Sequence, residues 1–239
     1  MSGHSKWANI KHRKEKTDAQ KGKLFSKIGR EISVVVRQGG PDPESNAKLR
    51  DVISKAKAAN MPIENIMRCI KKASGEIDGE NYEEIVYEGY GPGGVAIIVE
   101  AMTDNRKRTA GEIRHLFDKY GGNLGASGCV EWMFEKKGLI IIDKSNVSEE
   151  DELILRGLEA GAEDIKSEDD YYEITTEPEN FSSVRESLEK QGYFPESAVF
   201  VRIPNSMITL EGKVVEKLEK LIELLEENED VQHVYTNFA

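Results

Sequence analysis

The spacing of apolar residues changes near residue 82, and this change constrains the fold more than any other feature of the chain. Before it, apolar residues recur every three or four positions, as on one face of an α-helix. After it, apolar and charged residues alternate over residues 84–89, as in a half-buried strand, and helical and strand patterns then follow one another. The sequence therefore predicts an α+β protein whose helical part comes first.

Three helices are expected before residue 75, because each is bounded by residues typical of helix ends. A capping-box pattern at Thr17–Gln20 begins the first helix. Asp42-Pro43 begins the second, as the N-cap and the first helical residue. Pro62 begins the third, and Gly75 ends it. Three helices with short connectors predict a small bundle.

Residues 138–203 alternate between strand and helix patterns in the order βαββαβ. This order is the ferredoxin-like arrangement, an antiparallel sheet with two helices on one face. The expected strands are 139–143, 162–167, 171–176 and 197–203, and the expected helices are 149–159 and 181–191.

The segments on either side of this unit are incomplete by themselves. Residues 82–135 predict a hairpin, a helix over 105–120 capped by Thr103-Asp104, and a strand over 130–134. A long helix after Pro204 and a strand over 231–237 cannot bury themselves, so we expect them to return and complete the earlier segment. The predicted α+β fold thus has three domains, an N-terminal three-helix bundle and two α/β domains of ferredoxin-like (βαββαβ) type, the third inserted in the second. The predicted boundaries are 1–78, 79–136 plus 205–239, and 137–204.

Charge is divided unevenly along the 239 residues. Residues 1–80 contain 17 Lys and Arg against 10 Asp and Glu, whereas residues 81–239 contain 16 against 34, which gives the net charge of −11. A basic segment at the head of an acidic chain is typical of a protein that binds a polyanion through that segment.

The N-terminal arm, residues 1–16, is the candidate nucleic-acid-binding segment, together with the first helix. Lysine and arginine side chains neutralise phosphates and release condensed cations, while Trp and His rings offer faces on which unpaired bases stack. The alternative is a basic tail that serves only solubility, but an indole near a chain end needs a partner to cover it. The predicted nucleic-acid-binding residues are His4, Lys6, Trp7, Lys11, His12, Arg13, Lys14, Lys16, Lys21, Lys23, Lys27 and Arg30.

A second anion site is predicted at Arg106, Lys107 and Arg108. These cations stand in the first turn of the helix over 105–120, where they oppose the helix dipole. An anion at the helix start would turn this conflict into a binding site. The alternative is that Asp104, Glu112 or other acidic neighbours pair with the arginines.

Two glycine-rich stretches are weaker candidates for binding sites. Gly91–Gly94 lacks the Gly-Lys-Ser/Thr that ends a phosphate-binding P-loop, so a tight turn is expected there. Residues 121–128 contain Gly-x-x-Gly steps, as does the loop that clamps nucleotides in KH modules, but chain reversal is the favoured interpretation.

No catalytic residue, metal site or cofactor is expected. Cys69 and Cys129 have no partner at metal-ligand spacing, and this usage fits a reducing cytoplasm. His115 and His233 have no nucleophile nearby in sequence, and the acidic runs lack an apolar setting that would raise a pKa. No apolar run approaches the length of a spanning helix, and the N-terminus lacks the apolar core of a secretory signal, so no membrane partner is expected.

Several distinctive motifs are spread from end to end of the chain: Gly3-His-Ser-Lys-Trp-Ala-Asn-Ile-Lys-His-Arg-Lys14, Gly39-Gly-Pro-Asp-Pro-Glu-Ser-Asn46, Lys55-Ala-Lys-Ala-Ala-Asn-Met-Pro62, Tyr87-Glu-Gly-Tyr-Gly-Pro-Gly-Gly94, Thr103-Asp-Asn-Arg106, Arg108-Thr109 and Val234-Tyr-Thr-Asn-Phe238. Together these motifs resemble the YebC/PmpR family. The resemblance implies three domains, no catalytic residues, and a non-enzymatic regulator of gene expression. Lys107 and Cys129 depart from the family pattern, in which Asn and Ser are expected.

The resemblance leaves the target open between two descriptions of the family, as DNA-binding transcriptional regulators and as ribosome-associated translation factors that relieve stalling. A basic arm with a stacking Trp favours rRNA or tRNA on the ribosome, because no recognition helix for duplex DNA is evident. Promoter DNA is the alternative. The acidic domains are expected to meet basic ribosomal proteins or RNA polymerase, and a protein adaptor without nucleic-acid contact is the third hypothesis.

Overall fold

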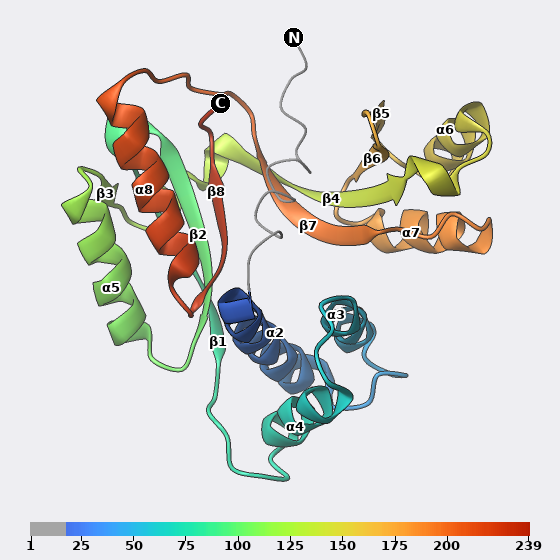
Figure 1. The fold of residues 1–239 in the computed structure, drawn as a ribbon, viewed down its shortest axis with the longest axis horizontal. Helices are drawn as coiled ribbons and strands as arrows, with labels where there is room; N and C mark the ends of the chain where they lie inside the picture. The colour runs from blue at the N-terminus through green and yellow to red at the C-terminus, as the bar shows by residue number, and fades with distance from the viewer. Residues whose placement is uncertain (1–17) are drawn as a thin grey trace. The chain divides into compact units, whose positions relative to one another are not determined.

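The computed structural model describes residues 18–239 and has an α+β fold that begins with helices. Over these residues it contains seven α-helices and two four-stranded antiparallel sheets (Figure 1). One compact unit comprises residues 133–205, and the other comprises the described residues up to 132 together with 206–239. The predicted α+β class is therefore confirmed, whereas the predicted arrangement in three domains and its boundaries stay a prediction.

Three helices form the N-terminal part: α2 (Asp18–Gly39), α3 (Ala47–Ala58) and α4 (Ile63–Ser74). They pack around a buried core to which all three contribute. Ile63 and Met67, which the spacing places inward, are instead exposed on α4. The core residues include Ile28, Ile32, Leu49, Val52, Ile66 and Ile70.

The second helix begins later than predicted, and Asn46 caps it in place of Asp42. The Asn46 side-chain oxygen accepts the N–H of Leu49 at 3.1 Å. Its amide nitrogen donates to the carbonyl oxygens of Val35 at 2.9 Å and Gly40 at 2.8 Å. Because this buried amide satisfies groups at the end of α2 and at the start of α3 together, it is a better cap than Asp42, which lies in the preceding turn.

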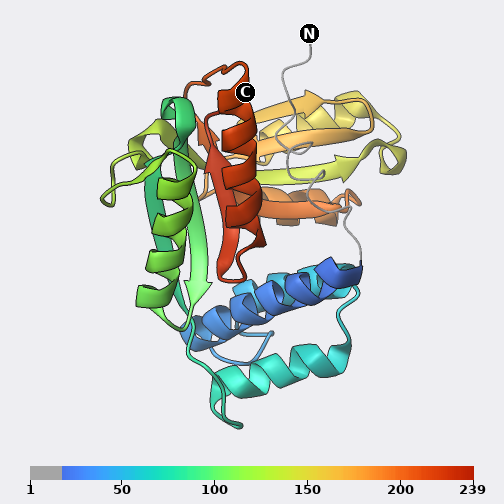
Figure 2. The same cartoon turned by 60° about the vertical axis from the view of Figure 1, so that its left-hand side comes forward.

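The first sheet belongs to the larger unit and has the order β3-β1-β2-β8. Helices α5 and α8 lie side by side over one of its faces (Figure 2), and their apolar residues share one core with β2 and β8. The C-terminal segment does return, since β8 pairs antiparallel with β2. The elements are β1 (Glu83–Tyr90), β2 (Ala96–Thr103), α5 (Arg106–Lys119), β3 (Asn123–Leu124), α8 (Lys213–Glu227) and β8 (Val231–Thr236).

The second sheet forms the unit of residues 133–205 and has the order β5-β6-β4-β7, all antiparallel. Its elements follow one another in the predicted order βαββαβ, and α6 and α7 share a core with β4 and β6. The elements are β4 (Phe134–Asp143), α6 (Glu150–Glu159), β5 (Asp164–Ser167), β6 (Tyr171–Thr176), α7 (Phe181–Lys190) and β7 (Ser197–Pro204).

The strand predicted over 130–134 is not present. Residues 131–133 form a single 3-10 turn, and β4 begins at Phe134. The reason is a side chain distant in sequence: the Glu88 carboxylate accepts the N–H groups of Val130 and Glu131, which therefore cannot join a strand ladder. Among the helices of residues 18–239, none combines the length and apolar content needed to cross a bilayer.

Candidate nucleic-acid interface

Eight of the twelve predicted nucleic-acid-binding residues, from His4 to Lys16, lie outside the described part of the chain. The other four lie on α2. Lys21 and Lys23 are exposed near its start. One turn further on, Lys27 contacts the C-terminal end of α8, and Arg30, nearly a turn later, contacts the turn between α8 and β8. The candidate interface therefore runs from exposed cations into cations that also hold the unit together.

The side chain of Lys27, on α2, is partly buried against the C-terminal end of α8. Its amine donates to the carbonyl oxygen of Glu226 at 2.8 Å, where a cation complements the helix dipole. Burial lowers the pKa of Lys27 to about 8, and the negative charge of Glu226 opposes this shift only in part. The amine is thus still mainly charged at neutral pH, although burial makes its charged form less stable than it would be in water.

We predict that replacing Lys27 with Met removes a pH dependence of stability. The folded protein releases this proton near pH 8, whereas the unfolded chain keeps it until about pH 10.4, so the wild type gains stability as pH rises between these values. From pH 7 to pH 9 the gain attributable to Lys27 is about 1 kcal/mol. Urea unfolding of both proteins at the two pH values measures it. An equal change in both proteins would contradict the assignment.

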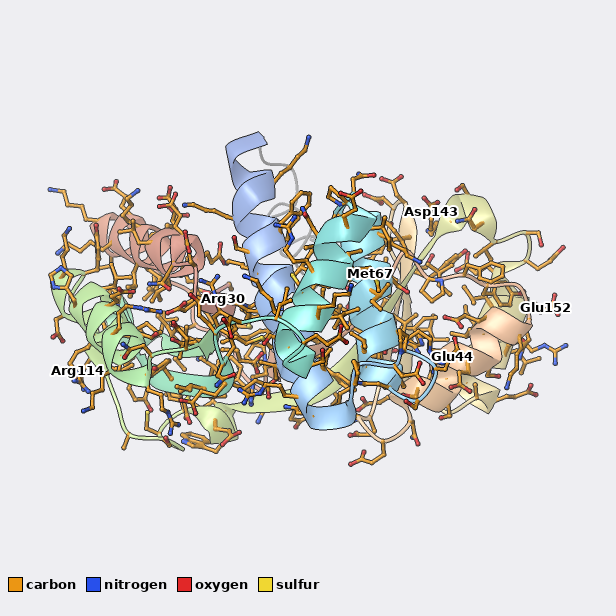
Figure 3. All side chains as sticks on the ribbon, turned by 90° about the horizontal axis from the view of Figure 1, so that it is seen from below. Arg30, Glu44, Met67, Arg114, Asp143 and Glu152 are labelled. Carbon is orange, nitrogen blue, oxygen red and sulfur yellow. The ribbon has the colours of Figure 1, made fainter. Side chains whose placement is uncertain are left out.

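Arg30 is a residue of α2 (Figure 3), and its side chain contacts the turn between α8 and β8. One guanidinium nitrogen donates to the carbonyl oxygen of Glu229 at 2.6 Å, and the other lies 3.3 Å from carboxylate oxygens of Glu229 and Asp230. The guanidinium also stands 5.4 Å from the centre of the Tyr82 ring. Arg30 is therefore held by several groups of its own unit.

Asp230 is the centre of a cluster that the sequence did not indicate. It is 3% exposed, and Arg30 and Arg108 approach it from α2 and α5, with Arg108 at 3.0 Å. The hydroxyls of Thr109 and Thr103 donate to the same carboxylate at 2.6 and 3.1 Å. We call these five residues the Asp230 cluster.

The protonation of Asp230 follows from these contacts. Burial by itself raises the pKa of a carboxyl group. The hydrogen bonds from Thr109 and Arg108, with the charge of Arg30, outweigh burial and hold the pKa of Asp230 below its ordinary value. The carboxylate therefore stays ionised at neutral pH and joins α2, α5 and β8.

The predicted anion site at the start of α5 is partly occupied by acidic neighbours. Asn105, not Asp104, is the N-cap, and it accepts the N–H of Arg108 at 3.1 Å. The Arg108 guanidinium pairs with Asp104 at 2.7 Å in addition to Asp230, as the alternative expected. Arg106 makes an exposed contact with Glu83 at 3.5 Å, and Lys107 is exposed. An anion here would depend on Arg106 and Lys107, and the site stays a prediction.

A cleft of about 820 Å³ lies next to the Asp230 cluster. Its walls come from α2, α4, the segment that precedes β1, the first half of α5 with the residue Asp104 before it, and the turn between α8 and β8. Both signs of charge line it, so a highly negative ligand gains little there. The charged lining residues are Arg30, Arg68, Lys72 and Arg108 with Glu80, Asp104, Glu112, Glu229 and Asp230.

The glycine-rich stretches reverse the chain, as expected. Gly91–Gly94 closes the hairpin between β1 and β2, with the N–H of Gly91 donating to Val95 at 2.8 Å. In the loop that follows β3, the N–H groups of Gly128, Val130 and Glu131 all donate to the carboxylate of Glu88, at 2.6, 3.0 and 2.8 Å. Glu88 is 4% exposed, although its alternation with apolar residues gave no sign of burial.

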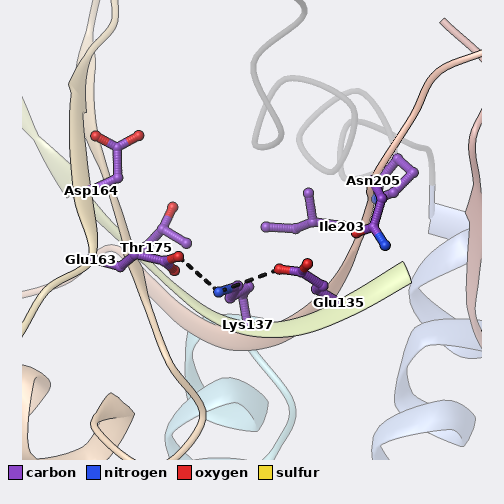
Figure 4. A pocket seen from close by; sticks show the side chains of 8 residues that line it. Glu135, Lys137, Glu163, Asp164, Thr175, Ile203 and Asn205 are labelled. Carbon is purple, nitrogen blue, oxygen red and sulfur yellow. Dashed lines mark hydrogen bonds and ion pairs between the residues drawn. The ribbon is translucent and has the colours of Figure 1, made fainter. Parts of the chain in front are cut away.

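The unit of residues 133–205 has a separate pocket of about 360 Å³ (Figure 4). Lys137 lies in it, 2.8 Å from Glu163, 2.6 Å from Glu177 and 3.5 Å from Glu135. Hydrogen bonds to Glu163 and Glu177 raise the pKa of Lys137. A lysine that acts as a base or nucleophile needs the opposite shift, so this one serves as a fixed cation.

The described titratable groups do not form a recognisable catalytic arrangement. His115 and His233 are exposed on α5 and β8. Burial raises the pKa values of the Cys69 and Cys129 thiols, which disfavours the reactive thiolate. Within residues 18–239 no group of His, Cys, Asp and Glu is arranged to hold a metal ion.

Two family models together match almost all of the chain. Residues 5–76 match the model described as the TACO1/YebC protein N-terminal domain. Residues 82–238 match the model described as the TACO1/YebC second and third domain.

Curated relatives and a solved structure match over nearly their full lengths. A probable transcriptional regulatory protein of Acetivibrio thermocellus is 65% identical, over 100% of this chain and 99% of its own. A probable transcriptional regulatory protein of Caldicellulosiruptor saccharolyticus is 62% identical, over 100% of this chain and 98% of its own. The crystal structure of a conserved hypothetical protein from Aquifex aeolicus is 52% identical, covers 98% of this chain and 97% of its own, and superposes with a TM-score of 0.87.

Proposed function

We propose, from the premise that this chain belongs to the TACO1/YebC family, that it is a non-enzymatic regulator of gene expression that binds nucleic acid. Its relatives are named probable transcriptional regulatory proteins. The observation that carries the proposal is the division of charge, with an excess of seven cations in residues 1–80 and of eighteen carboxylates in the remainder. The acidic part is repelled by a phosphate lattice, so the basic part must make the contact.

The target that we propose is RNA on the ribosome, in the manner of a cytoplasmic translation factor that relieves stalling. The exposed Lys21 and Lys23 continue the line of cations of the N-terminal arm onto α2. Lys27 and Arg30 are engaged within the unit, so the strongest phosphate contacts are expected nearer the arm. Basic ribosomal proteins are suitable partners for the acidic domains.

Promoter DNA is the second candidate target, favoured by the names of the relatives. In that case RNA polymerase would take the place of ribosomal proteins as the partner of the acidic domains. A protein adaptor without nucleic-acid contact is the third candidate, and there the arm would be dispensable.

We further propose that the chain is organised as three domains, the bundle of residues 1–78 and two α/β domains of ferredoxin-like type. The β4–β7 unit supports this for the inserted domain, since it has the strand order of a split βαβ fold. For the discontinuous domain, the support is the pairing of β8 with β2.

Neutralising the arm tests the proposed function. Replacing Lys6, Lys11, Arg13, Lys14 and Lys16 with Gln removes five cations and is expected to weaken binding to ribosomes at least about tenfold, with a smaller dependence on salt. Sedimentation of cell lysate through sucrose gradients, at two salt concentrations, measures the association. Deletion of residues 1–16 should have the same effect.

The matched control removes five exposed lysines from elsewhere, so that both variants reach the same net charge. Its association with ribosomes should stay near that of the wild type. Unchanged association of the arm variant would refute the RNA proposal, and tight, sequence-dependent binding of duplex DNA without ribosome association would establish the alternative. The control substitutions to Gln are at Lys166, Lys190, Lys213, Lys217 and Lys220.

A further inference from the structure

The segment between β3 and β4 presents an aromatic pair in a fixed orientation. Trp132 exposes 71% of its surface, and its indole N–H donates to the carbonyl oxygen of Cys129 at 3.1 Å. Tyr90, at the end of β1, is 37% exposed and donates its hydroxyl to the same oxygen at 3.2 Å. One carbonyl group thus positions two rings that come from different elements.

Glu88 makes this segment rigid. Its buried carboxylate accepts the N–H groups of Gly128, Val130 and Glu131, and its backbone carbonyl accepts that of Gly125 at 2.8 Å. Hydrogen bonds to a carboxylate are stronger than those between neutral groups. The two rings are therefore held in place before any ligand arrives, and binding loses little conformational entropy.

The same hydrogen bonds restrict the chemistry of the ligand. A Gly-x-x-Gly loop that clamps a nucleotide backbone needs N–H groups directed at the phosphate. Here three N–H groups, from residue 128 to residue 131, already donate to Glu88, and the carboxylate places a negative charge beneath the loop. A phosphate is therefore disfavoured at the loop itself, and the exposed faces of the two rings favour a flat, uncharged group as the ligand.

We propose that Trp132 and Tyr90 form a platform on which an unpaired nucleobase of RNA stacks. This inference rests on the proposed function and adds a second contact, separate from the basic arm. Every base has a π-face, so stacking on such rings needs no particular sequence.

Tryptophan fluorescence tests the platform directly, because the chain has only two tryptophans, Trp7 and Trp132. In the full-length Trp7→Phe variant all tryptophan emission comes from Trp132. Titration with a twelve-nucleotide oligouridylate should quench this emission in parallel with binding, which the anisotropy of a labelled oligonucleotide reports. Saturating binding with unchanged Trp132 emission would overturn the proposal.

Affinity measurements on single substitutions provide a second test. Trp132→Ala should weaken oligouridylate binding about tenfold, while Trp132→Phe should recover part of the loss. The slope of log affinity against log salt should not change, because stacking neutralises no phosphate. Phe194→Ala, which removes an aromatic side chain that is 66% exposed elsewhere in the chain, is the matched control and should bind like the wild type.

The possible results separate this inference from the function on which it rests. Equal affinity of Trp132→Ala and wild type, with binding still lost in the arm variant, would overturn the platform and leave the proposed function standing. Absence of RNA binding by the wild type would overturn both. If Trp132→Ala abolished association with ribosomes but not with oligouridylate, the aromatic pair would contact a protein, and base stacking would be refuted.

Discussion

Replacing Asp230 with alanine is expected to lower the free energy of unfolding by about 3 to 5 kcal/mol, the range found when one partner of a buried ion pair is removed. The substitution leaves the guanidinium of Arg30 and the hydroxyls of Thr103 and Thr109 without their common acceptor. It also disconnects α2 from β8 at this point. Chemical unfolding in urea at pH 7, monitored by circular dichroism, measures the loss.

The control for this prediction is the neighbouring residue. Glu229 also contacts Arg30 through its carboxylate, at 3.3 Å, but its side chain is 65% exposed. Since exposed ion pairs contribute between about 0 and 1 kcal/mol, Glu229→Ala should cost less than about 1 kcal/mol. A cost for Asp230→Ala no greater than that for Glu229→Ala would show that the cluster does not hold the unit together.

The contribution of Asp230 should also depend on pH. Because its pKa is lowered in the folded state, its stabilisation is complete above the pKa of the unfolded chain, about 3.9, and is lost as pH falls through the lower folded value. The stability difference between wild type and Asp230→Asn should therefore shrink below about pH 4. A difference that stays constant between pH 7 and pH 3 would contradict the lowered pKa.

Glu88→Ala is expected to cost about 2 to 4 kcal/mol of stability. It leaves three N–H groups without an acceptor, each of which costs about 1 to 3 kcal/mol when buried, and water can reach some of them because Gly128 and Glu131 are exposed. The loop that carries Trp132 should loosen at the same time. Hydrogen exchange of the amides at 128, 130 and 131, together with urea unfolding, measures both effects.

Glu84 provides the matched control, since it lies on the same strand and is exposed. Glu84→Ala should change the stability by no more than about 0.5 kcal/mol. Protection factors in the loop that remain unchanged in Glu88→Ala would mean that Glu88 does not organise this segment.

The helix ends that were predicted correctly depend on their own backbone. Gly75, predicted to end the third helix, ends α4 in the left-handed conformation with φ of 84°. Asn60, just after α3, also has a positive φ, of 58°. These residues act within one turn of the chain, so their effect can be inferred without knowing what packs nearby. The predicted start of the second helix was wrong for the opposite reason, because it depends on contacts outside the helix. Asn46 caps α3 while its amide also donates to the carbonyls of Val35 and Gly40.

The candidate interface shows the same difference between features set by the local sequence and features set by tertiary contacts. The sequence predicted which cations stand near the head of the chain, but not that Arg30 and Arg108 meet at one carboxylate from helices far apart in sequence. Nothing in the turn that contains Asp230 indicated that meeting, because a single acidic residue after a helix is usually exposed. The regular alternation around Glu88 gave no signal of its burial either.

By itself, the sequence determined the α+β class, the order of the elements and the separation of positive from negative charge, because periodicity, end-capping residues and charge are properties of short stretches of chain. Only the tertiary structure decided which of those charges are exposed to a partner and which are used internally. Burial and hydrogen bonding depend on residues brought together from distant positions, as Glu88 and Asp230 both are.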